Sequence, residues 1–281
     1  MAEKFYNRIA QDYDNDWNNI YKDTRSVGIG QILEHCGDRT LDAALDLAVG
    51  TGNSFADLER HISIRRRTGN DLSSEMLKQA ARKIQGPVEF ICDDARNILH
   101  HVPQASQDLI LCHYLFSYLD SDLILDTAFK LLKPGGFISL ATTTKQNLLE
   151  LSTGRFRHTG RLFRVGNHLS KVDTPENHQA CLDLLATHQF QVVRHSNYRK
   201  EALFRSFADV ISWAVDSGWA AQYFDSGFRL KVLLGRLLFA GAAVVMHPLY
   251  PIIAHSDISI VLAVKSGTES SYQRKTTSCL I

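Results

Sequence analysis

The sequence predicts an α/β fold with a doubly wound sheet of seven strands and helical cap insertions. Short apolar runs alternate with amphipathic segments from Leu45 onward, a pattern typical of βα units that build a parallel sheet. A glycine-rich turn follows the first run and opens a helix. The chain has 281 residues. At roughly 100–200 residues per domain, this length fits one large domain with insertions.

Strands are expected where β-branched and aliphatic residues cluster. The seven expected strands are Leu45–Val49, Ile64–Asn70, Val88–Cys92, Asp108–Cys112, Phe137–Thr142, Phe190–Val193 and Asp257–Val264. Helices are expected at Asn53–His61, after Ser73, at Leu123–Leu132 and near Ala180. Ser73 suits a helix start because its hydroxyl can accept from a free backbone amide, and Lys133-Pro134-Gly135-Gly136 suits a helix end.

Two stretches interrupt this alternation, Lys145–Val172 and Asn197–Ser256, and we expect both to be insertions. The second is expected to contain helices at Phe207–Ala221 and Leu230–Met246. We therefore divide the chain into N-terminal lid helices (1–40), a core (41–144), a basic cap insertion (145–173), a core helix and strand (174–196), an apolar helical cap insertion (197–256), the last core strand (257–266) and a flexible tail (267–281).

Composition excludes several classes of protein. The 31 Lys and Arg residues balance 30 Asp and Glu residues, and the resulting net charge of +1 argues against nucleic acid as a partner. The five cysteines are widely spaced and form no C-x-x-C pair, which indicates a reducing compartment. The segment Met1–Asp16 lacks the apolar stretch of a secretory signal, so we expect a cytoplasmic protein. The histidines show no metal-ligand spacing, so no metal is expected.

The turn Asp46-Leu47-Ala48-Val49-Gly50-Thr51-Gly52 ends a strand and opens a helix. Its small residues let the backbone approach a ligand at a positively polarised helix end. Asp71 follows Gly52 by 19 residues at the end of the second strand, where a carboxylate can accept hydrogen bonds from a ribose. A nucleotide-like ligand is therefore predicted. The structural alternative is a tight turn followed by an acid at a helix start.

With these residues the chain resembles the class I S-adenosylmethionine (SAM) dependent methyltransferases, particularly the small-molecule branch with quinone C-methyltransferases and carrier-protein methyl-ester methyltransferases. The resemblance covers residues 40–145: the turn above, Gly69 to Leu77 (GNDLSSEML), Asp93-Asp94-Ala95, Asp108-Leu109-Ile110 and Leu132 to Gly136 (LKPGG). It implies a Rossmann-like sheet whose last strand is antiparallel, SAM as the cofactor, and methyl transfer as the activity. Ala48 stands where the family usually has its first glycine.

The resemblance also implies which residues bind SAM. They are Tyr13, Asp46, Ala48, Gly50, Gly52, Asp71, Leu72, Asp94, Ala95 and His113. The turn would cradle the methionine end, Asp71 would hold the ribose hydroxyls, and Asp94 would accept from the adenine amino group. Leu72 would pack against the adenine, and Tyr13 belongs to a segment that resembles the family's lid over SAM.

His113 and Tyr114 directly follow the fourth strand, and ligands of such sheets bind outside the carboxyl ends of the strands. We predict both as catalytic residues. His113 would be a general base for a protonated nucleophile, and Tyr114 or Tyr118 would orient the acceptor. A carboxylate acceptor would need no base. The structural alternative is a packed His113 side chain.

The two insertions are expected to bind the substrate. Four arginines interleaved with phenylalanines would hold an anionic head group: Arg155, Arg157, Arg161 and Arg164. An apolar wall is expected from Trp213, Trp219 and Tyr223. The alternatives are a solvated surface or a grip on RNA for the arginines, and a small helical core for the aromatic residues.

The apolar stretch Leu237–Ala254 has 18 residues and is interrupted by Pro248 and Pro251. We expect a buried or substrate-lining cap rather than a membrane span, with peripheral membrane contact as the alternative.

The sequence thus predicts a cytoplasmic SAM-dependent methyltransferase that methylates oxygen or carbon of a small, largely apolar or amphipathic acceptor, with an anionic head group as an option. Two alternatives stay open. An RNA or tRNA methyltransferase would bind nucleic acid with steep salt dependence. A SAM-binding protein that transfers no methyl group would be a scaffold or a rearrangement catalyst.

Overall fold

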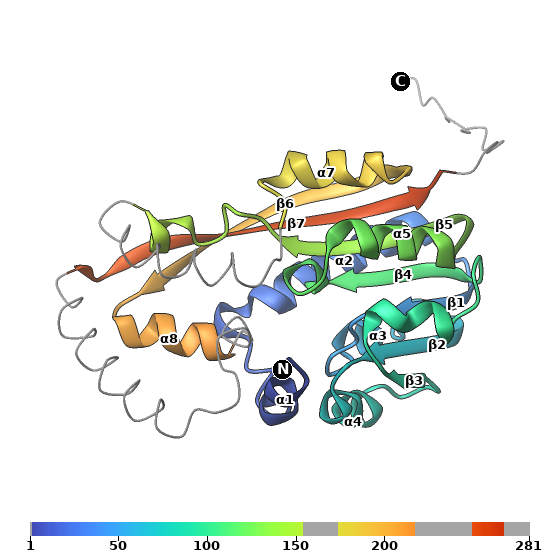
Figure 1. Cartoon of the computed structure of the whole chain (residues 1–281), viewed down its shortest axis with the longest axis horizontal. Helices are drawn as coiled ribbons and strands as arrows, with labels where there is room; N and C mark the ends of the chain where they lie inside the picture. The colour runs from blue at the N-terminus through green and yellow to red at the C-terminus, as the bar shows by residue number, and fades with distance from the viewer. Residues whose placement is uncertain (1, 154–173, 217–248, 267–281) are drawn as a thin grey trace, which may run out of the picture.

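The computed structural model describes residues 2–153, 174–216 and 249–266. Within these residues, seven strands form one sheet in the order β3-β2-β1-β4-β5-β7-β6, which confirms the predicted fold class (Figure 1). The strands are β1 (Leu41–Asp46), β2 (Ile64–Asp71), β3 (Glu89–Cys92), β4 (Gln107–His113), β5 (Leu132–Thr143), β6 (Phe190–Phe204) and β7 (Ile252–Lys265). β1 to β5 are parallel, and β7 lies antiparallel between β5 and β6, so the last strand is antiparallel as predicted.

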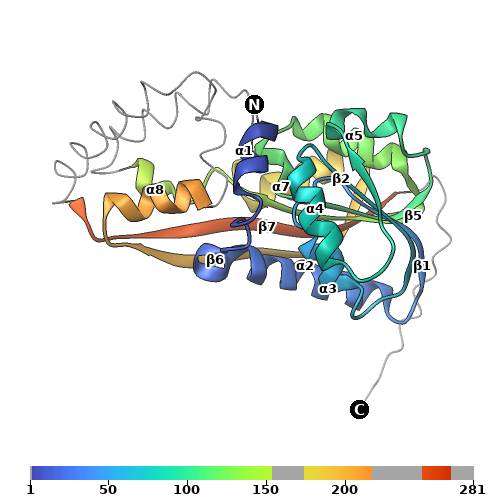
Figure 2. The ribbon, with the colours of Figure 1, turned by 90° about the horizontal axis from the view of Figure 1, so that it is seen from below.

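Helices cover both faces of the sheet (Figure 2). One face carries α2 (Ile20–Cys36), α3 (Asn53–Leu58) and α4 (Ser74–Lys83), and the other carries α5 (Ser121–Leu131) and α7 (His178–Thr187). The remaining elements are α1 (Ala2–Ile9), α8 (Phe207–Asp216) and the 3-10 turns η1 (Trp17–Asn19), η2 (Ala95–His100), η3 (Leu115–Ser117) and η4 (Leu149–Ser152). Alternate residues of β4 enter opposite cores, Ile110 toward α5 and Leu109 toward α2. This burial on both faces explains its continuous apolar run.

The helix α2 corrects the expectation of lid helices over residues 1–40. Ile32 is fully buried, and Ile29 and Cys36 are nearly so, in the core between α2 and the sheet. These residues recur three and four positions apart, the spacing of a helix that packs one face on a core. Residues 20–36 are therefore a layer of the fold, and the lid stays a prediction only for the segment before them.

The last two strands are longer than expected. β6 continues to Phe204 and β7 starts at Ile252, so residues 197–204 and 252–256, assigned above to the apolar insertion, are paired strands. β6 is an edge strand whose side chains are mostly exposed or half-buried, and its many polar residues hid the strand in the sequence. Beyond the main sheet, the extension packs against η4 and α8 through Ala202, Phe204 and Ala254.

Two other boundaries also differ. β1 covers Leu41–Asp46 rather than Leu45–Val49, because the chain already turns at Leu47. β5 starts at Leu132, so the residues expected to end the preceding helix lie in the strand. Ser73 caps α4 as predicted, with its hydroxyl accepting from the Met76 backbone at 3.1 Å. Among the described helices, none combines the length and apolar character needed to cross a bilayer.

Candidate active site

A cleft of about 430 Å³ opens at the carboxyl ends of β1, β4 and β5. Its lining comes from the N-terminal segment, the glycine turn and the strand ends: Tyr13, Asp14, Asp16, Asn19, Tyr21, Lys22, Arg25, Ala48, Val49, Gly50, Thr51, Asn53, Ser54, Lys83, His113, Tyr114 and Ala141. Five of the predicted site residues therefore meet in one place. They are Tyr13, Ala48, Gly50, His113 and Tyr114.

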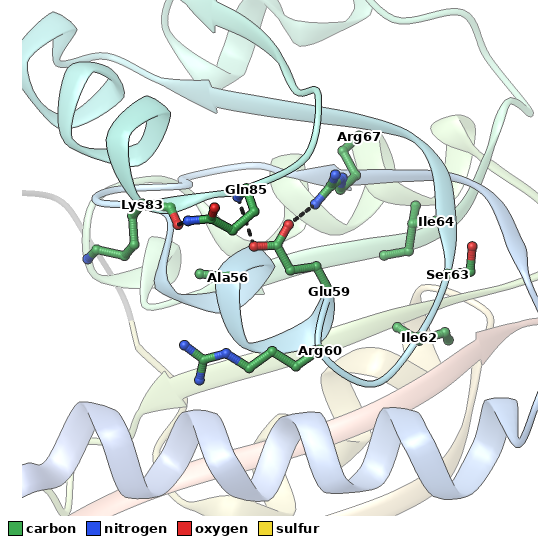
Figure 3. A pocket seen from close by; sticks show the side chains of 9 residues that line it. All are labelled: Ala56, Glu59, Arg60, Ile62, Ser63, Ile64, Arg67, Lys83 and Gln85. Carbon is green, nitrogen blue, oxygen red and sulfur yellow. Dashed lines mark hydrogen bonds and ion pairs between the residues drawn. The ribbon is translucent and has the colours of Figure 1, made fainter.

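A second cavity, of about 450 Å³, lies beside the start of β2 rather than at the strands' carboxyl ends (Figure 3). Glu59 accepts from Nη1 of Arg67 at 2.6 Å and from the backbone of Gln85 at 2.9 Å. These contacts join α3, β2 and the end of α4, so the polar groups have structural partners. None of the predicted site residues lines this cavity, and we place the active site in the cleft.

The glycine turn approaches its neighbours closely. Gly52 has φ of +83°, and a Cβ there would lie 2.9 Å from the Cβ of Ala80 in α4. Gly50 has φ of +53°, and a Cβ there would meet only the Tyr13 ring, at 4.0 Å. Both positions need glycine, because other residues are strained at such angles. The backbone at Gly50 is therefore open toward the cleft, while Gly52 serves the packing of α4.

Two carboxylates, those of Asp71 and Asp46, accept hydrogen bonds from the backbone of this turn. Asp71, at the end of β2, accepts from the backbone of Gly50 at 2.9 Å and from that of Ser73 at 2.8 Å. Burial raises its pKa, and the backbone donors act in the opposite direction. Asp46 is 2% exposed, and burial raises its pKa to about 7, with the Asp71 charge adding to the effect. The turn thus lies on two acidic groups that are close enough to influence each other.

The predicted adenine contacts lie beside the cleft but do not line it. Leu72 is 38% exposed, so its apolar side chain is accessible next to Asp71. Asp94 caps η2 and accepts from Nε and Nη2 of Arg96 at 2.9 and 2.6 Å. That ion pair is the main cause of its lowered pKa. Ala95 is buried in the core.

The N-terminal segment is fastened over the glycine turn by polar contacts. Asp14 accepts from Thr51 at 2.7 Å, from Asn53 at 2.8 Å and from Lys83 at 2.5 Å. Nearer the N-terminus, Asn7 of α1 accepts from the Ser73 hydroxyl at 2.7 Å. The N-terminal segment therefore lies against the glycine turn and α4, and its role as a lid over a cofactor stays a prediction.

His113 is held between two hydroxyls. Its Nε2 lies 3.1 Å from Oγ of Ser139, and its Nδ1 lies 3.3 Å from Oγ of Ser54. Burial lowers the pKa of His113 to about 4, and the nearby Arg25 adds to this shift. The imidazole is therefore neutral near pH 7 and binds a proton weakly, which favours a positioning role over the predicted general base.

Five tyrosines, here called the tyrosine cluster, lie between the N-terminal segment and the end of β4: Tyr6, Tyr13, Tyr21, Tyr114 and Tyr118. The Tyr6 hydroxyl donates to that of Tyr118 at 2.5 Å, and the hydroxyls of Tyr114 and Thr24 share a hydrogen bond of 2.6 Å. Burial raises the pKa of every member, so all five phenols stay protonated. The cluster is an aromatic wall with neutral hydroxyls.

The sequence interpretation missed several cleft residues, above all Arg25. This arginine lies on α2 and donates from Nε to Asp57 at 2.7 Å. Its side chain is 18% exposed, and its other N–H groups have no partner among the described residues. Neither Arg25 nor its neighbour Lys22 belongs to a motif, and the only sequence clue was their position one turn apart on a helix before β1.

In the described ranges, no three His, Cys, Asp or Glu side chains are arranged to hold a metal ion.

Most predicted substrate residues cannot be placed. Arg155, Arg157, Arg161, Arg164, Trp219 and Tyr223 lie outside the described residues. Trp213 belongs to α8, and its ring centroid lies 6.2 Å from that of Phe204. It lines a small cavity next to the cleft rather than the cleft itself. Tyr118 does not line the cleft, but it belongs to the tyrosine cluster through its contact with Tyr6.

Comparison with known proteins gives a consistent family. Residues 44–136 match the family model of a methyltransferase domain. The chain is 25% identical over 159 residues to a malonyl-[acyl-carrier protein] O-methyltransferase of Marinomonas sp. (strain MWYL1), a match that covers 56% of each protein. It is 28% identical over 150 residues to the ubiquinone/menaquinone biosynthesis C-methyltransferase UbiE of Desulfotalea psychrophila, covering 51% of this chain and 58% of that protein. The match thus spans little more than half the length of either relative.

A solved structure shares the fold. The N-methyltransferase NodS from Bradyrhizobium japonicum, in complex with S-adenosyl-L-homocysteine, superposes with a TM-score of 0.53 at 12% identity. The superposition covers 93% of this chain and 98% of that one. At this identity the similarity concerns the architecture of the sheet and its helices.

Proposed function

This chain belongs, through residues 44–136, to the class I SAM-dependent methyltransferase superfamily, and from that premise we propose that it transfers a methyl group from SAM to a small, largely apolar acceptor. One observation carries the proposal. The Asp71 carboxylate and the open backbone of Gly50 meet, at 2.9 Å, beside a cleft at the carboxyl ends of the parallel strands. Ligands of open α/β sheets bind at this edge.

The donors and acceptors of the site fit SAM. The Asp71 carboxylate offers about four acceptor sites, and the backbone N–H groups of Gly50, Ser73 and Leu72 occupy up to three, which leaves at least one for a ribose hydroxyl. The exposed Leu72 offers an apolar face for the adenine. The backbone at Gly50 can be approached from the cleft. Arg25 has N–H groups without a partner in the part of the chain that the structure describes, and these suit the carboxylate of the methionine part.

SAM supplies a methyl group activated by a positively charged sulfur, and the acceptor supplies the electron pair that attacks it. The protein's task is therefore to align the two and to keep water out. The tyrosine cluster and the N-terminal segment fastened by Asp14 are placed to exclude water. Ser139 and Ser54 fix the ring of His113 at the end of β4, where it would orient the acceptor.

The low pKa of His113, about 4, bears on the kind of acceptor. A base this weak removes protons poorly from an alcohol or an amine at neutral pH. We therefore favour an acceptor atom that is ionised before it binds, such as a carboxylate oxygen or an acidic carbon. The two curated relatives are named for O- and C-methylation, respectively, and both remain within this proposal.

We keep a small amphipathic molecule, rather than nucleic acid, as the partner. The charges that line the cleft are mixed in sign, with Asp14 and Asp16 beside Lys22, Arg25 and Lys83. A nucleic-acid groove is instead dominated by positive charge.

Calorimetry with S-adenosylhomocysteine (SAH) tests the proposal. We expect the wild-type protein and an exposed control, Asp38→Asn, to bind SAH equally. Asp71→Asn should bind at least about tenfold more weakly, because it loses charge-assisted hydrogen bonds to the ribose. Formation of SAH from SAM should then appear with a member of a panel of amphipathic carboxylic acids and β-keto acids. An unchanged affinity in Asp71→Asn, or no heat with the wild type, would refute the proposed cofactor site.

A further inference from the structure

A small cavity of about 30 Å³ lies behind the cleft. Tyr21 and Tyr114 line both spaces, and their rings meet edge to face with centroids 4.7 Å apart. The far wall comes from three other elements, with Leu148 next to η4, Trp213 on α8, and Ser256 and Ile258 on β7. We call this space the neutral pocket.

Ser256 is the unusual residue of the neutral pocket. It is 1% exposed, and its Oγ has no hydrogen-bond partner among the described residues. Ser259, three residues along the same strand, is equally buried, but its Oγ lies 2.8 Å from Nδ1 of His178. A buried hydroxyl without a partner is destabilising, because it has given up its hydrogen bonds to water. The other polar residues of the pocket have partners, Thr143 with Ser117 and Asn147 with the Asp257 backbone. Ser256 is therefore positioned to bind something that enters the pocket.

The chemistry of the wall limits what that ligand can be. No charged side chain lines the pocket among the described residues. The pocket lies between two apolar clusters. One contains Phe204 and Leu148, and the other contains Ile20 and Ile258. Transfer of a carboxylate or an ammonium group into such surroundings is strongly unfavourable without a counter-charge. A neutral oxygen on a hydrocarbon, in contrast, would satisfy Ser256 and match the rest of the wall.

We propose that the neutral pocket binds the uncharged end of the methyl acceptor, with Ser256 donating a hydrogen bond to a carbonyl or hydroxyl oxygen. A cavity of about 30 Å³ accommodates about two water-sized groups, which corresponds to a methyl group and an oxygen. The rest of the molecule passes Tyr21 and Tyr114 into the cleft, where its nucleophilic atom meets the cofactor. This inference rests on the proposed function, since it assigns one end of the same acceptor.

Calorimetry with a simple probe tests the pocket. The probe is 2-nonanone, whose acetyl end matches the methyl group and oxygen. In the presence of saturating SAH, the wild type should bind 2-nonanone. Ser256→Ala should weaken the ketone about fivefold, the effect expected for one neutral hydrogen bond. Ser256→Leu should fill the cavity and abolish binding of the ketone, while Ser259→Ala, the matched control on the same strand, should leave it unchanged.

SAH affinity, measured on every variant, separates the two proposals and confirms folding. If the wild type binds SAH but not 2-nonanone, or if Ser256→Leu binds the ketone as tightly as the wild type, then the cavity holds a trapped water only and this inference is wrong. If the wild type does not bind SAH, the proposed function itself fails. If Ser256→Leu does not fold, Ser256→Val, a smaller change, must still weaken the ketone and spare SAH.

Discussion

The cleft and the neutral pocket share Tyr21 and Tyr114 as a common wall but differ in charge. The cleft is lined by two acidic and three basic side chains, together with His113, and the part of the pocket that the structure describes has none of these. Charged groups suit a cofactor with a sulfonium and an amino acid end, whereas a neutral wall suits hydrocarbon. In the proposed function, these two tyrosines would divide the site into a part for the cofactor and a part for the acceptor.

The two regions also differ in what stabilises them. Hydrogen bonds of Asp14 hold the N-terminal segment on the cleft side, while buried apolar side chains such as Phe204 hold the pocket side. Substitutions should therefore act differently on each side: on the pocket side through lost packing, and on the cleft side through lost binding and altered pH dependence.

The largest effect is expected from Phe204→Ala on the pocket side. Phe204 is fully buried between β6, η4 and α8, so its truncation should lower the free energy of unfolding by about 3–5 kcal/mol. Leu203, its neighbour, is 45% exposed, and Leu203→Ala should change stability by less than about 0.5 kcal/mol. Urea titration measures both. Loss of SAH affinity in folded Phe204→Ala would contradict the separation of the two regions.

The second prediction concerns pH on the cleft side. Burial lowers the pKa of His113 to about 4, below its unfolded value of about 6.5, so His113 makes stability rise with pH between these limits. Burial raises the pKa of Asp46 to about 7, above its unfolded value of about 3.9, so Asp46 makes stability fall with pH over nearly the same window. In the wild type the two contributions oppose each other.

Single substitutions should reveal each contribution. Between pH 4.5 and 6.5, each group contributes a slope of roughly 1.4 kcal/mol per pH unit. Relative to the wild type, His113→Gln should lose stability as the pH rises, and Asp46→Asn should gain it, by about 2 kcal/mol over that range. Urea midpoints at the two pH values provide the measurement. Ser256→Ala, on the pocket side, should follow the wild type, and slopes of equal sign in the two cleft variants would disprove the assignment.

Arg25→Gln tests the charge of the cleft with a smaller effect. If Arg25 holds the carboxylate of the cofactor, the variant should bind SAH about tenfold more weakly, the value of one charge-assisted hydrogen bond. Its affinity for 5′-methylthioadenosine, which lacks the amino acid part, should not change, nor should that for 2-nonanone. Arg60→Gln is the matched control, since Arg60 pairs with the same Asp57 at 3.1 Å but does not line the cleft. Equal losses for both nucleosides would exclude a role at the carboxylate.

The same two regions differ in how far the sequence predicts them. The glycine turn, Asp71 and the end of β4 lie in short segments whose residue types are fixed by close backbone approach and by strand ends. Local patterns of this kind can be read from one sequence. The neutral pocket is built from residues as distant in sequence as Ile20 and Ser256. Their meeting depends on the packing of α2 against β7 and on the start of β7 at Ile252, before the predicted start of that strand at Asp257.

The cleft was also incompletely predicted, for a related reason. Arg25 carries no motif, and its place in the cleft follows from the packing of α2 on the sheet, which the expectation of a lid had excluded. The base strength of His113 likewise depends on burial and on Arg25, and neither is visible from its position after a strand. Residue type and spacing therefore predicted the position of the candidate site, while tertiary packing sets the pKa values of its side chains.

The smallest expected effect, from Asp14→Asn, tests whether the N-terminal segment closes the cleft. Asp14 accepts from Thr51, Asn53 and Lys83, and its side chain is 43% exposed, so the charge contributes about 0.5–1 kcal/mol and is screened by salt. Loss of that charge should speed hydrogen exchange of the amides in residues 2–19 by about twofold to fivefold at low salt, and less at high salt. Amides of β6 and β7 should exchange as in the wild type. Bound SAH should slow exchange in residues 2–19 in both proteins, because a ligand under this segment binds only when it is closed. Equal exchange with and without SAH would mean that residues 2–19 do not cover the cofactor, and the lid would have to be sought elsewhere in the chain.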